Sequence, residues 1–355
     1  MRVRRGWDVF CRVIDNHGDL GVAWRLCADL AGRGEGVRLW VDDAAALAWM
    51  APQGQAGVDL VAWTDPAPDL EPGDVVVETF GCDPPPRFVQ RMAERASPPA
   101  WLNLEYLSAE AYVERSHGLP SPVNVRGRLL TKRFFYPGFT AGSAGLLREP
   151  GLLAAQQVFD RDGWLRELGL GAHPGERLVS LFCYDNPALA GLLDVLCDAP
   201  TLLLVAPGAA ATQTGALLGP TLRRGALRAR LLPYLPQPGY DRLLWACDLN
   251  FVRGEDSFVR AQWAGRPFVW QIYPQQGGAH GVKLHAFLDR LLVDIDDAVA
   301  EPLRRFWLGW NALAPLPATL PVPGPWQSLC EGWRDSLLRQ PDLTTRLLRF
   351  AEKTR

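Results

Sequence analysis

The chain has 355 residues, of which 48% are hydrophobic and 21% are charged. This composition is far too apolar for a disordered protein, and the length is typical of about two domains. The 37 basic and 39 acidic residues leave a formal net charge of −2, which excludes a broad basic surface for nucleic acid or for an anionic membrane. A small local anion site remains compatible with this balance.

The cysteine pattern and the length of the apolar stretches indicate the cellular compartment. The seven cysteines form no Cys-x-x-Cys pair, and most of them stand in apolar runs. We therefore expect buried, reduced thiols rather than disulfides or a zinc site. No apolar stretch approaches the roughly 18 residues that a membrane helix needs. We expect a soluble, cytoplasmic protein with no membrane partner.

Short apolar runs alternate with longer stretches whose apolar residues recur at helical spacing. Continuous runs such as Val75-Val76-Val77 are typical of parallel strands that are covered on both faces. Their alternation with helical patterns indicates an α/β fold with parallel sheets. In chain order, the predicted strands span residues 8–14, 37–41, 75–78, 101–106, 178–184, 202–206, 249–252 and 268–273.

A loop-rich segment at residues 117–150 interrupts the alternation, which resumes near residue 176. We therefore predict a first α/β domain over residues 1–155 and a second over residues 156–337. A C-terminal helix within residues 338–355 could pack back on the first domain. The helices predicted after the second sheet span residues 299–313, 327–338 and 343–350.

The first segment that could carry chemistry lies between Asp15 and Gly21, where a predicted strand runs into a helix. Ligands bind at the carboxyl ends of strands in open α/β sheets. The glycines at 18 and 21 do not fit the dinucleotide pattern Gly-x-Gly-x-x-Gly, and no Gly-Lys-Ser/Thr phosphate loop is present. Asp15 and Asp19 are either a functional pair of carboxylates or turn residues, with Asp19 capping the helix and Asp15 closing an Asx-turn.

A second such segment spans residues 250–258, where a strand again leads through a glycine turn into a helix. Free backbone N–H groups at a helix start bind anions, and Arg253 adds positive charge. Glu255 and Asp256 oppose a phosphate at this point, although acidic residues are common in the first turn of a helix. The segment is a moderate signal for a phosphorylated ligand.

A third group combines aromatic and polar residues near strand ends. Phe182 and Tyr184 lie at the end of one predicted strand, Leu235 and Gln237 lie in a turn, and Tyr273 ends another strand. Aromatic residues at strand ends usually belong to the core. The alternative is a platform on which a pyrimidine base stacks, with glutamine or backbone groups reading its edge.

Together these segments resemble the elongation factor P maturation arginine rhamnosyltransferases. The similarity runs in order from about residue 7 to residue 285 and extends less distinctly to the end. Its most specific element is the run Arg-Gly-Glu-Asp-Ser-Phe-Val-Arg-Ala-Gln-Trp. The segments that carry it span residues 14–22, 102–108, 117–122, 134–140 and 253–263.

The resemblance implies a GT-B glycosyltransferase, with two Rossmann-like domains facing across a cleft and the donor held mainly by the second. Such enzymes transfer L-rhamnose from dTDP-β-L-rhamnose to an arginine side chain of elongation factor P. They invert the anomeric centre and use neither a metal nor another cofactor. In the two segments singled out above, at residues 15–21 and 250–258, the carboxylates form no Asp-x-Asp motif, which agrees with this expectation.

The resemblance also implies roles for individual residues. Asp19 is expected as the general base, with Asp15 beside it and Glu255 as the third carboxylate of the catalytic set. Arg253 and the backbone near Asp256 and Ser257 are expected to bind the diphosphate. The other residues expected on the donor side are Asn16, His17, Gly18, Phe182, Tyr184, Leu235, Gln237, Gly254 and Tyr273.

Two other functions stay open at this point. One is a GT-B transferase with another nucleotide sugar or another acceptor. The other is a non-catalytic module that binds a ribosome-associated protein and uses its acidic turns only as helix caps. A nicotinamide dehydrogenase is disfavoured because the glycine fingerprint is missing.

Overall fold

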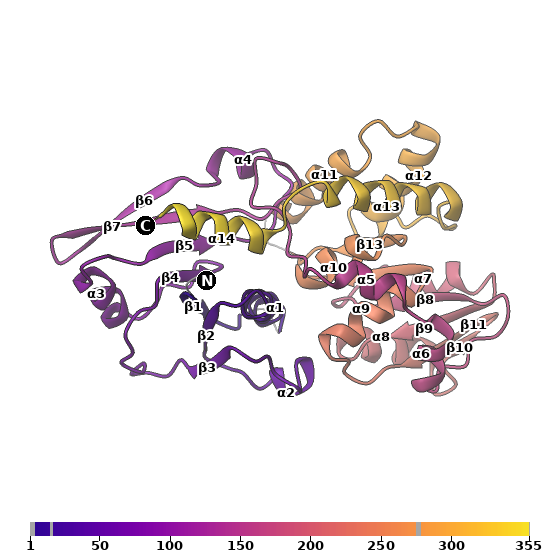
Figure 1. The fold of residues 1–355 in the computed structure, drawn as a ribbon. Helices are drawn as coiled ribbons and strands as arrows, with labels where there is room; N and C mark the ends of the chain where they lie inside the picture. Colours follow the sequence, from indigo (N-terminus) through magenta and orange to yellow (C-terminus); the bar gives the residue numbers. More distant parts are fainter. Residues whose placement is uncertain (1–3, 15–16, 275–277, 355) are drawn as a thin grey trace. The chain divides into compact units, whose positions relative to one another are not determined.

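The computed structural model describes residues 4–14, 17–274 and 278–354 (Figure 1). The chain divides into two compact units. Unit 1 combines Met1–Glu149 with Gln340–Arg355, and unit 2 is Pro150–Arg339. The boundaries therefore fall after residues 149 and 339, where the sequence suggested residues 155 and 337.

Unit 1 is built on one sheet in which neighbouring strands run parallel, apart from an antiparallel pair at one edge. Its order across the sheet is β3 (Val58–Ala62), β2 (Gly36–Val41), β1 (Gly6–Cys11), β4 (Val75–Thr79), β5 (Ala100–Leu104), β7 (Arg128–Phe135) and β6 (Pro120–Val125). The central strands β4 and β5 are buried throughout, and for β4 the apolar run Val75-Val76-Val77 predicted this.

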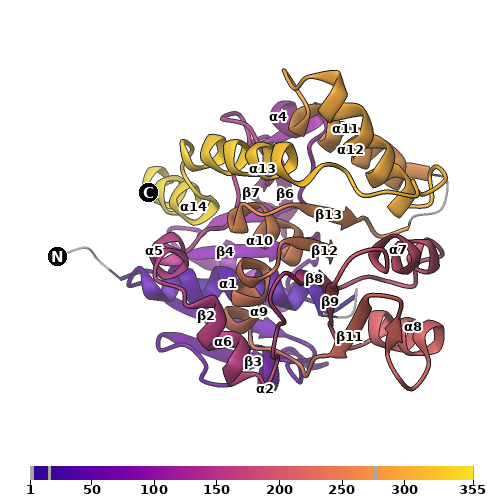
Figure 2. The same cartoon turned by 90° about the vertical axis from the view of Figure 1, so that its right-hand side faces the viewer.

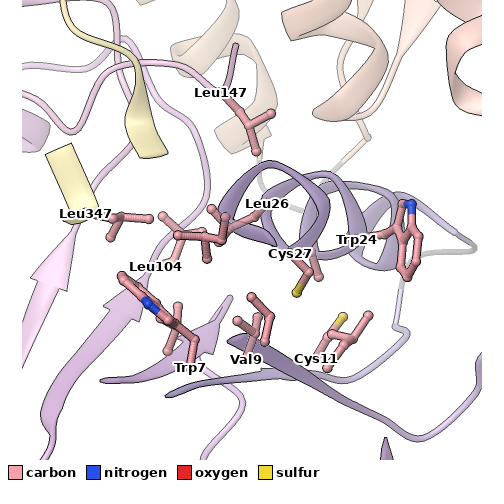
Figure 3. Packing of buried hydrophobic residues seen from close by; sticks show 14 of the residues in the cluster. Trp7, Val9, Cys11, Trp24, Leu26, Cys27, Leu104, Leu147 and Leu347 are labelled. Atoms are coloured by element: carbon pink, nitrogen blue, oxygen red, sulfur yellow. The ribbon is translucent and has the colours of Figure 1, made fainter. Parts of the chain in front are cut away.

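The helices of unit 1 supply its core. Figure 3 shows α1 (Gly18–Gly32) placing Trp24, Leu26 and Cys27 against Val9 of β1 and neighbouring strand residues. Leu347 reaches the same cluster from the C-terminal helix. The other helices of this unit are α2 (Leu47–Met50), α3 (Pro86–Glu94), α4 (Tyr112–Ser116) and α14 (Leu343–Lys353).

The helix α14 returns to unit 1 after the chain has completed unit 2. Asp342 caps its start by accepting from the Thr345 N–H at 2.8 Å. Arg33, at the end of α1, donates to both Asp29 and Asp342 at 2.8–2.9 Å. These polar contacts fix the helix at its first turn, while its apolar face is buried in the core of unit 1.

The hairpin formed by β6 and β7 corrects one expectation. The prolines at 120 and 122 indicated a loop, but both lie in β6, which pairs antiparallel with β7. Proline cannot donate to a ladder, so it is tolerated on an edge strand, and β6 is the edge of this sheet. The strands β3, β10 and β11 were also missed, because β10 has only two residues and charged residues interrupt the apolar run in the other two.

Unit 2 contains a second mostly parallel sheet (Figure 2). Its order is β10 (Arg223–Arg224), β11 (Leu227–Leu231), β9 (Thr201–Val205), β8 (Arg177–Leu181), β12 (Leu249–Arg253) and β13 (Phe268–Gln271). Its helices are α5 (Leu152–Gln157), α6 (Arg161–Glu167), α7 (Leu189–Leu196), α8 (Ala209–Leu218), α9 (Gln237–Ala246), α10 (Asp256–Ala264), α11 (Ala279–Leu291), α12 (Asp297–Trp310) and α13 (Pro323–Leu338).

Each predicted strand coincides with an observed one, but several predicted strands run past the observed carboxyl end. The strand predicted over residues 8–14 ends at Cys11, and the one predicted over 178–184 ends at Leu181. The residues that follow leave the ladder and form loops at the carboxyl ends of the sheets. These loops carry the polar and aromatic residues singled out above.

All seven cysteines carry free thiols, and five of them are buried. Burial raises the pKa of Cys11 to about 12. In the described part of the chain, no helix combines the length and the apolar character needed to cross a membrane.

A buried ion pair lies within the sheet of unit 1. Glu78 on β4 is fully buried and accepts from Lys132 Nζ and from Trp101 Nε1, each at 2.8 Å. The Lys132 ammonium also stands over the Trp101 ring, 5.1 Å from its centroid. Burial raises the pKa of Glu78 from 4.5 to about 7, against the opposing effect of Lys132.

This shift predicts a pH dependence of stability. Because the folded-state pKa is the higher one, the stabilisation due to Glu78 is complete below pH 4.5 and is lost as the pH rises to about 7. From pH 4.5 to about 7, the parent's free energy of unfolding should fall by about 3 kcal/mol more than that of Glu78→Gln. The glutamine keeps an acceptor for Trp101 and has no proton to lose. Urea titrations of both proteins across this range provide the measurement, and parallel profiles would contradict the prediction.

Candidate active site

The strand order of unit 2 places a topological switch point between β8 and β12. Successive connections run from β8 through β9 to β11 on one side and from β12 to β13 on the other. Open α/β sheets bind ligands outside the carboxyl ends of the two strands at such a point. Phe182 and Tyr184 follow β8, and Arg253 ends β12, so the predicted residues meet there.

The Arg253 side chain lies against two aromatic rings at this switch point. Its guanidinium carbon is 4.5 Å from the ring centroid of Phe182 and 4.3 Å from that of Tyr184. Cation–π contacts of this kind hold an arginine in place without neutralising it. Within the described residues no carboxylate forms an ion pair with Arg253, so its N–H groups can meet an incoming anion.

The turn after Arg253 brings the start of α10 to the same place. Gly254 has φ +65°, and a Cβ atom there would stand 3.5 Å from the Tyr184 hydroxyl. The Ser257 hydroxyl donates to the Arg253 carbonyl and accepts from the Arg253 N–H at 3.2 Å. Glu255 is the N-cap residue and makes no side-chain cap hydrogen bond. The start of α10 therefore lies next to Arg253, and N–H groups at the start of a helix can bind an anion.

Aromatic and amide groups extend the site along β13. The Tyr184 N–H donates to Gln271 Oε1 at 2.8 Å, and the two rings of Tyr184 and Tyr273 meet edge to face with centroids 5.1 Å apart. Tyr273 is 51% exposed, whereas Gln271 is buried. An exposed ring beside a fixed one suits the stacking of a planar base.

The loop between β11 and α9 supplies the remaining predicted residues of unit 2. Pro236 is the N-cap of α9, and Gln237 is its first residue, with the side chain largely buried. Leu235 is partly buried against the apolar cluster around Trp164 and Leu178. Leu235 and Gln237 thus follow the carboxyl end of β11, and Phe182 and Tyr184 follow the carboxyl end of β8 in the same sheet.

In unit 1, the corresponding switch point lies between β1 and β4. Asp15 and Asn16 lie outside the described residues. His17 is the exposed N-cap residue of α1, and its ring meets Trp49 edge to face at 5.8 Å. Gly18 opens the helix.

Asp19 does not cap the helix, and this corrects one of the two expectations for it. The cap position belongs to His17, whereas Asp19 lies in the first turn and is only 4% exposed. Its Oδ2 accepts from the Ile14 N–H at 3.2 Å, and its Oδ1 accepts from the Tyr106 hydroxyl at 3.4 Å. The carboxylate is thus held across the turn that follows β1 and is oriented by a residue beyond β5.

The sequence reasoning missed part of this arrangement. Tyr106 stacks on Phe80 with ring centroids 4.3 Å apart, and Phe80 adopts a positive φ of 58°. Next to it, Glu105 accepts from the Asn103 amide at 2.8 Å, and burial raises the pKa of this half-buried carboxyl. In the sequence, the available signal for this contact was the pair Phe80-Gly81 directly after the buried strand β4. Only the strand order reveals that Phe80 faces Tyr106.

In the described part of the chain, no group of three or more His, Cys, Asp or Glu side chains is arranged to hold a metal ion.

The family model of the elongation factor P (EF-P) rhamnosyltransferase EarP matches residues 7–352. The chain belongs to this family. The protein-arginine rhamnosyltransferase of Pseudomonas aeruginosa is 45% identical, with 97% of this chain and 98% of that one covered. That of Neisseria meningitidis is 35% identical, with 97% and 96% covered. The resemblance carried by the sequence motifs is confirmed, and it identifies the chain as a rhamnosyltransferase.

Solved structures confirm the fold. A structure that explains EarP-mediated arginine glycosylation of translation elongation factor EF-P is 34% identical, covers 99% of each chain and has a TM-score of 0.68. SnogD from Streptomyces nogalater is 14% identical with a TM-score of 0.55, and Acinetobacter baumannii MurG is 11% identical with a TM-score of 0.53. These two share the fold alone, and the predicted α/β GT-B class is correct.

Proposed function

We propose that this protein transfers L-rhamnose from dTDP-β-L-rhamnose to an arginine side chain of EF-P, with inversion at the anomeric carbon. The observation that carries the donor part is the Arg253 guanidinium held between Phe182 and Tyr184 at the switch point of unit 2. Membership of the EarP family supports the acceptor part. We expect the reaction in the cytoplasm, where translation factors act, with no cofactor and no nucleic-acid partner.

On the donor side, the diphosphate meets Arg253 and the N–H groups at the start of α10, near Asp256 and Ser257. As the sugar leaves, the bond between its anomeric carbon and the diphosphate oxygen breaks, and the oxygen keeps the electron pair. A fixed cation and fixed N–H donors stabilise this developing charge without the need to reorganise. Gly254 allows the backbone to approach the diphosphate closely.

The thymine ring stacks on the aromatic residues at this sheet edge. Tyr184 and Tyr273 offer their ring faces and edges to the base, and the Phe182 ring packs against the Arg253 guanidinium. Gln237 and the turn at Leu235 line the nucleoside and its sugar. Asn16, His17 and Gly18 are further candidates for contacts with the donor.

On the acceptor side, the arginine nitrogen attacks the anomeric carbon and loses one proton. Guanidinium is a poor nucleophile because its charge is delocalised and its pKa exceeds 12. Asp19 accepts the proton, since its carboxylate is held in one orientation by Ile14 and Tyr106. Asp15 and Glu255 complete the catalytic set, and a second carboxylate localises the acceptor's charge on the nitrogens that do not react.

The direct test is the intact mass of EF-P after incubation with this protein and dTDP-β-L-rhamnose. A gain of one deoxyhexose supports the proposal, and tandem mass spectrometry assigns it to arginine. Transfer only from UDP-sugars would point to another GT-B transferase. Unmodified EF-P with no donor hydrolysis would favour the non-catalytic module.

Ligand binding provides an independent prediction. dTDP should raise the melting temperature, because binding to the native state stabilises it by mass action, whereas NAD should not. Differential scanning fluorimetry across a series of ligand concentrations measures both. Equal shifts with dTDP and NAD would remove the nucleotide-sugar assignment.

Arg253→Ala should weaken dTDP binding more than it lowers turnover at saturating donor. A contact that already exists with the bound donor contributes to both the ground state and the transition state, so its loss appears mainly in KM. Calorimetry with dTDP gives the affinity, and single-turnover transfer gives the rate. Unchanged dTDP affinity would show that Arg253 does not bind the diphosphate.

A further inference from the structure

The indole of Trp270 reaches from β13 to the turn that precedes α10. Trp270 is the third residue of β13 and is partly buried, and its Nε1 donates to the Gly254 carbonyl at 2.9 Å. Gly254 lies 16 residues earlier in the sequence, between Arg253 and the N-cap residue Glu255. A side chain from the neighbouring strand therefore holds the backbone of the turn to which we assign the diphosphate.

Packing and backbone contacts fix the direction of this indole. Its ring stacks on Phe258 of α10, with centroids 4.0 Å apart and 8° between the planes, and it meets Phe287 of α11 edge to face. Asn311, the C-cap residue of α12, donates to the Trp270 carbonyl at 2.9 Å and accepts from the Ile272 N–H at 3.0 Å. The end of β13 and the ring that it carries are thus fixed by contacts with three helices.

The conformation of Gly254 makes this hydrogen bond important. Its φ of +65° is accessible to glycine at little cost, and glycine also leaves the peptide bond that follows it freer to rotate than other residues do. The next residue, Glu255, has α-helical backbone angles of φ −91° and ψ −49°. Its N–H is therefore aligned with those of the first turn of α10, which point out of the helix start.

The bond from Trp270 selects one of two orientations of the peptide that joins Gly254 to Glu255. A peptide is planar and trans, so its C=O and its N–H point to opposite sides. While the carbonyl accepts from the indole, the Glu255 N–H faces away from Trp270 and out of the helix start. If this peptide turned over, an anion at the start of α10 would meet a carbonyl oxygen, with its partial negative charge, instead of an N–H.

We propose that Trp270 is a positioning residue of the donor site, and that its indole N–H keeps the Gly254 carbonyl turned so that the Glu255 N–H faces the diphosphate of the nucleotide sugar. This inference rests on the proposed function, in which the diphosphate meets Arg253 and the start of α10. In this role Trp270 does not touch the nucleotide sugar and acts through the backbone of the turn. Binding then costs less free energy, because the N–H is already oriented when the ligand arrives.

Trp270→Phe tests this inference because it removes the N–H and keeps an aromatic ring to stack on Phe258. The Kd for dTDP should rise about tenfold, as expected when one oriented N–H is lost to the diphosphate. The Kd for thymidine, which has no diphosphate, should stay within about twofold of the parent's, well below that tenfold effect. The KM for dTDP-β-L-rhamnose should rise more than kcat falls. Calorimetry gives both Kd values, and steady-state transfer to EF-P gives KM and kcat.

Trp333→Phe is the matched control. The Trp333 indole also meets Phe287 edge to face, and its Nε1 donates to Gln262 Oε1 at 2.8 Å, near the C-terminal end of α10. Each variant loses one indole hydrogen bond to this part of unit 2, so both should melt a few degrees below the parent. Only Trp270→Phe should lose dTDP affinity, and its thymidine binding shows that the variant is folded.

The outcomes separate this inference from the function on which it rests. A lower melting temperature of Trp270→Phe with unchanged dTDP affinity would overturn the inference and leave a structural role. A similar loss of dTDP affinity in Trp333→Phe would also overturn it, because a disturbance anywhere along α10 would then be sufficient. An equal loss of thymidine and dTDP affinity in Trp270→Phe would contradict it as well, since the effect would then concern the nucleoside. If the parent itself does not bind dTDP, the proposed function fails together with the inference.

Discussion

Asp19→Asn should lower single-turnover rhamnose transfer to EF-P by about 10²–10⁴ while leaving dTDP affinity near that of the parent. The amide has the shape of the carboxylate and still offers one oxygen to Ile14 or Tyr106. It cannot accept a proton from the reacting guanidinium. Since one of the two donors will face the amide NH₂ group, a loss of about 1 kcal/mol in the free energy of unfolding is also expected.

Asp42→Asn is the matched control for this variant. Asp42 accepts from the Val13 N–H at 3.0 Å, so it supports the same loop after β1 as Asp19 does. It has no role in the proposed chemistry, and transfer should stay within about threefold of the parent rate, well inside the range expected for a lost base. If Asp19→Asn also transfers rhamnose within that limit and melts like the parent, Asp19 is not the base.

Arg260→Met should destabilise the protein by about 3–5 kcal/mol, the largest effect on stability that we expect from one substitution. The Arg260 and Asp241 side chains are 2% and 7% exposed and are joined by two parallel hydrogen bonds. Methionine fills similar space but removes the guanidinium that pairs with the buried Asp241 carboxylate. Urea unfolding, followed by tryptophan fluorescence, measures the change.

Arg304→Met is the corresponding control, because Arg304 pairs with Asp289 at the surface of unit 2, where side-chain exposure is 26% and 65%. Its loss should cost no more than about 1 kcal/mol. The double variant Asp241→Leu with Arg260→Met should recover most of the stability, since no buried charge remains. A similar cost for Arg260→Met and Arg304→Met would show that the buried pair does not hold α9 and α10 together.

The sequence by itself determined the type of each buried element. Runs such as Val75-Val76-Val77 are apolar at every position, and a strand covered on both faces is the structure that buries such a run. It also indicated candidate site residues at the ends of those strands, in the turns around Asp19 and Arg253. Periodicity and turn residues are local properties, so the amino-acid order is enough to predict them.

Prediction from the sequence failed where one local signal is compatible with two structures. Pro120 and Pro122 indicate a loop in any segment that would otherwise be a central strand, yet they are accepted in β6 because that strand has a free edge. Asp19 fits a helix cap by residue type. Its hydrogen bonds to Ile14 and Tyr106 give it another role.

Only the tertiary structure decided which strand ends meet. Tyr106 reaches Asp19 across 87 residues because β5, β4 and β1 are neighbours in the sheet. Arg253 lies over Phe182 because β12 pairs with β8. Strand order depends on how segments that are distant in the sequence pair and pack. Their pairing costs chain entropy and buries apolar surface, and no local pattern in the sequence gives the balance of these two contributions. The candidate residues of each turn could therefore be proposed from the sequence, whereas the way they come together within each unit required the fold.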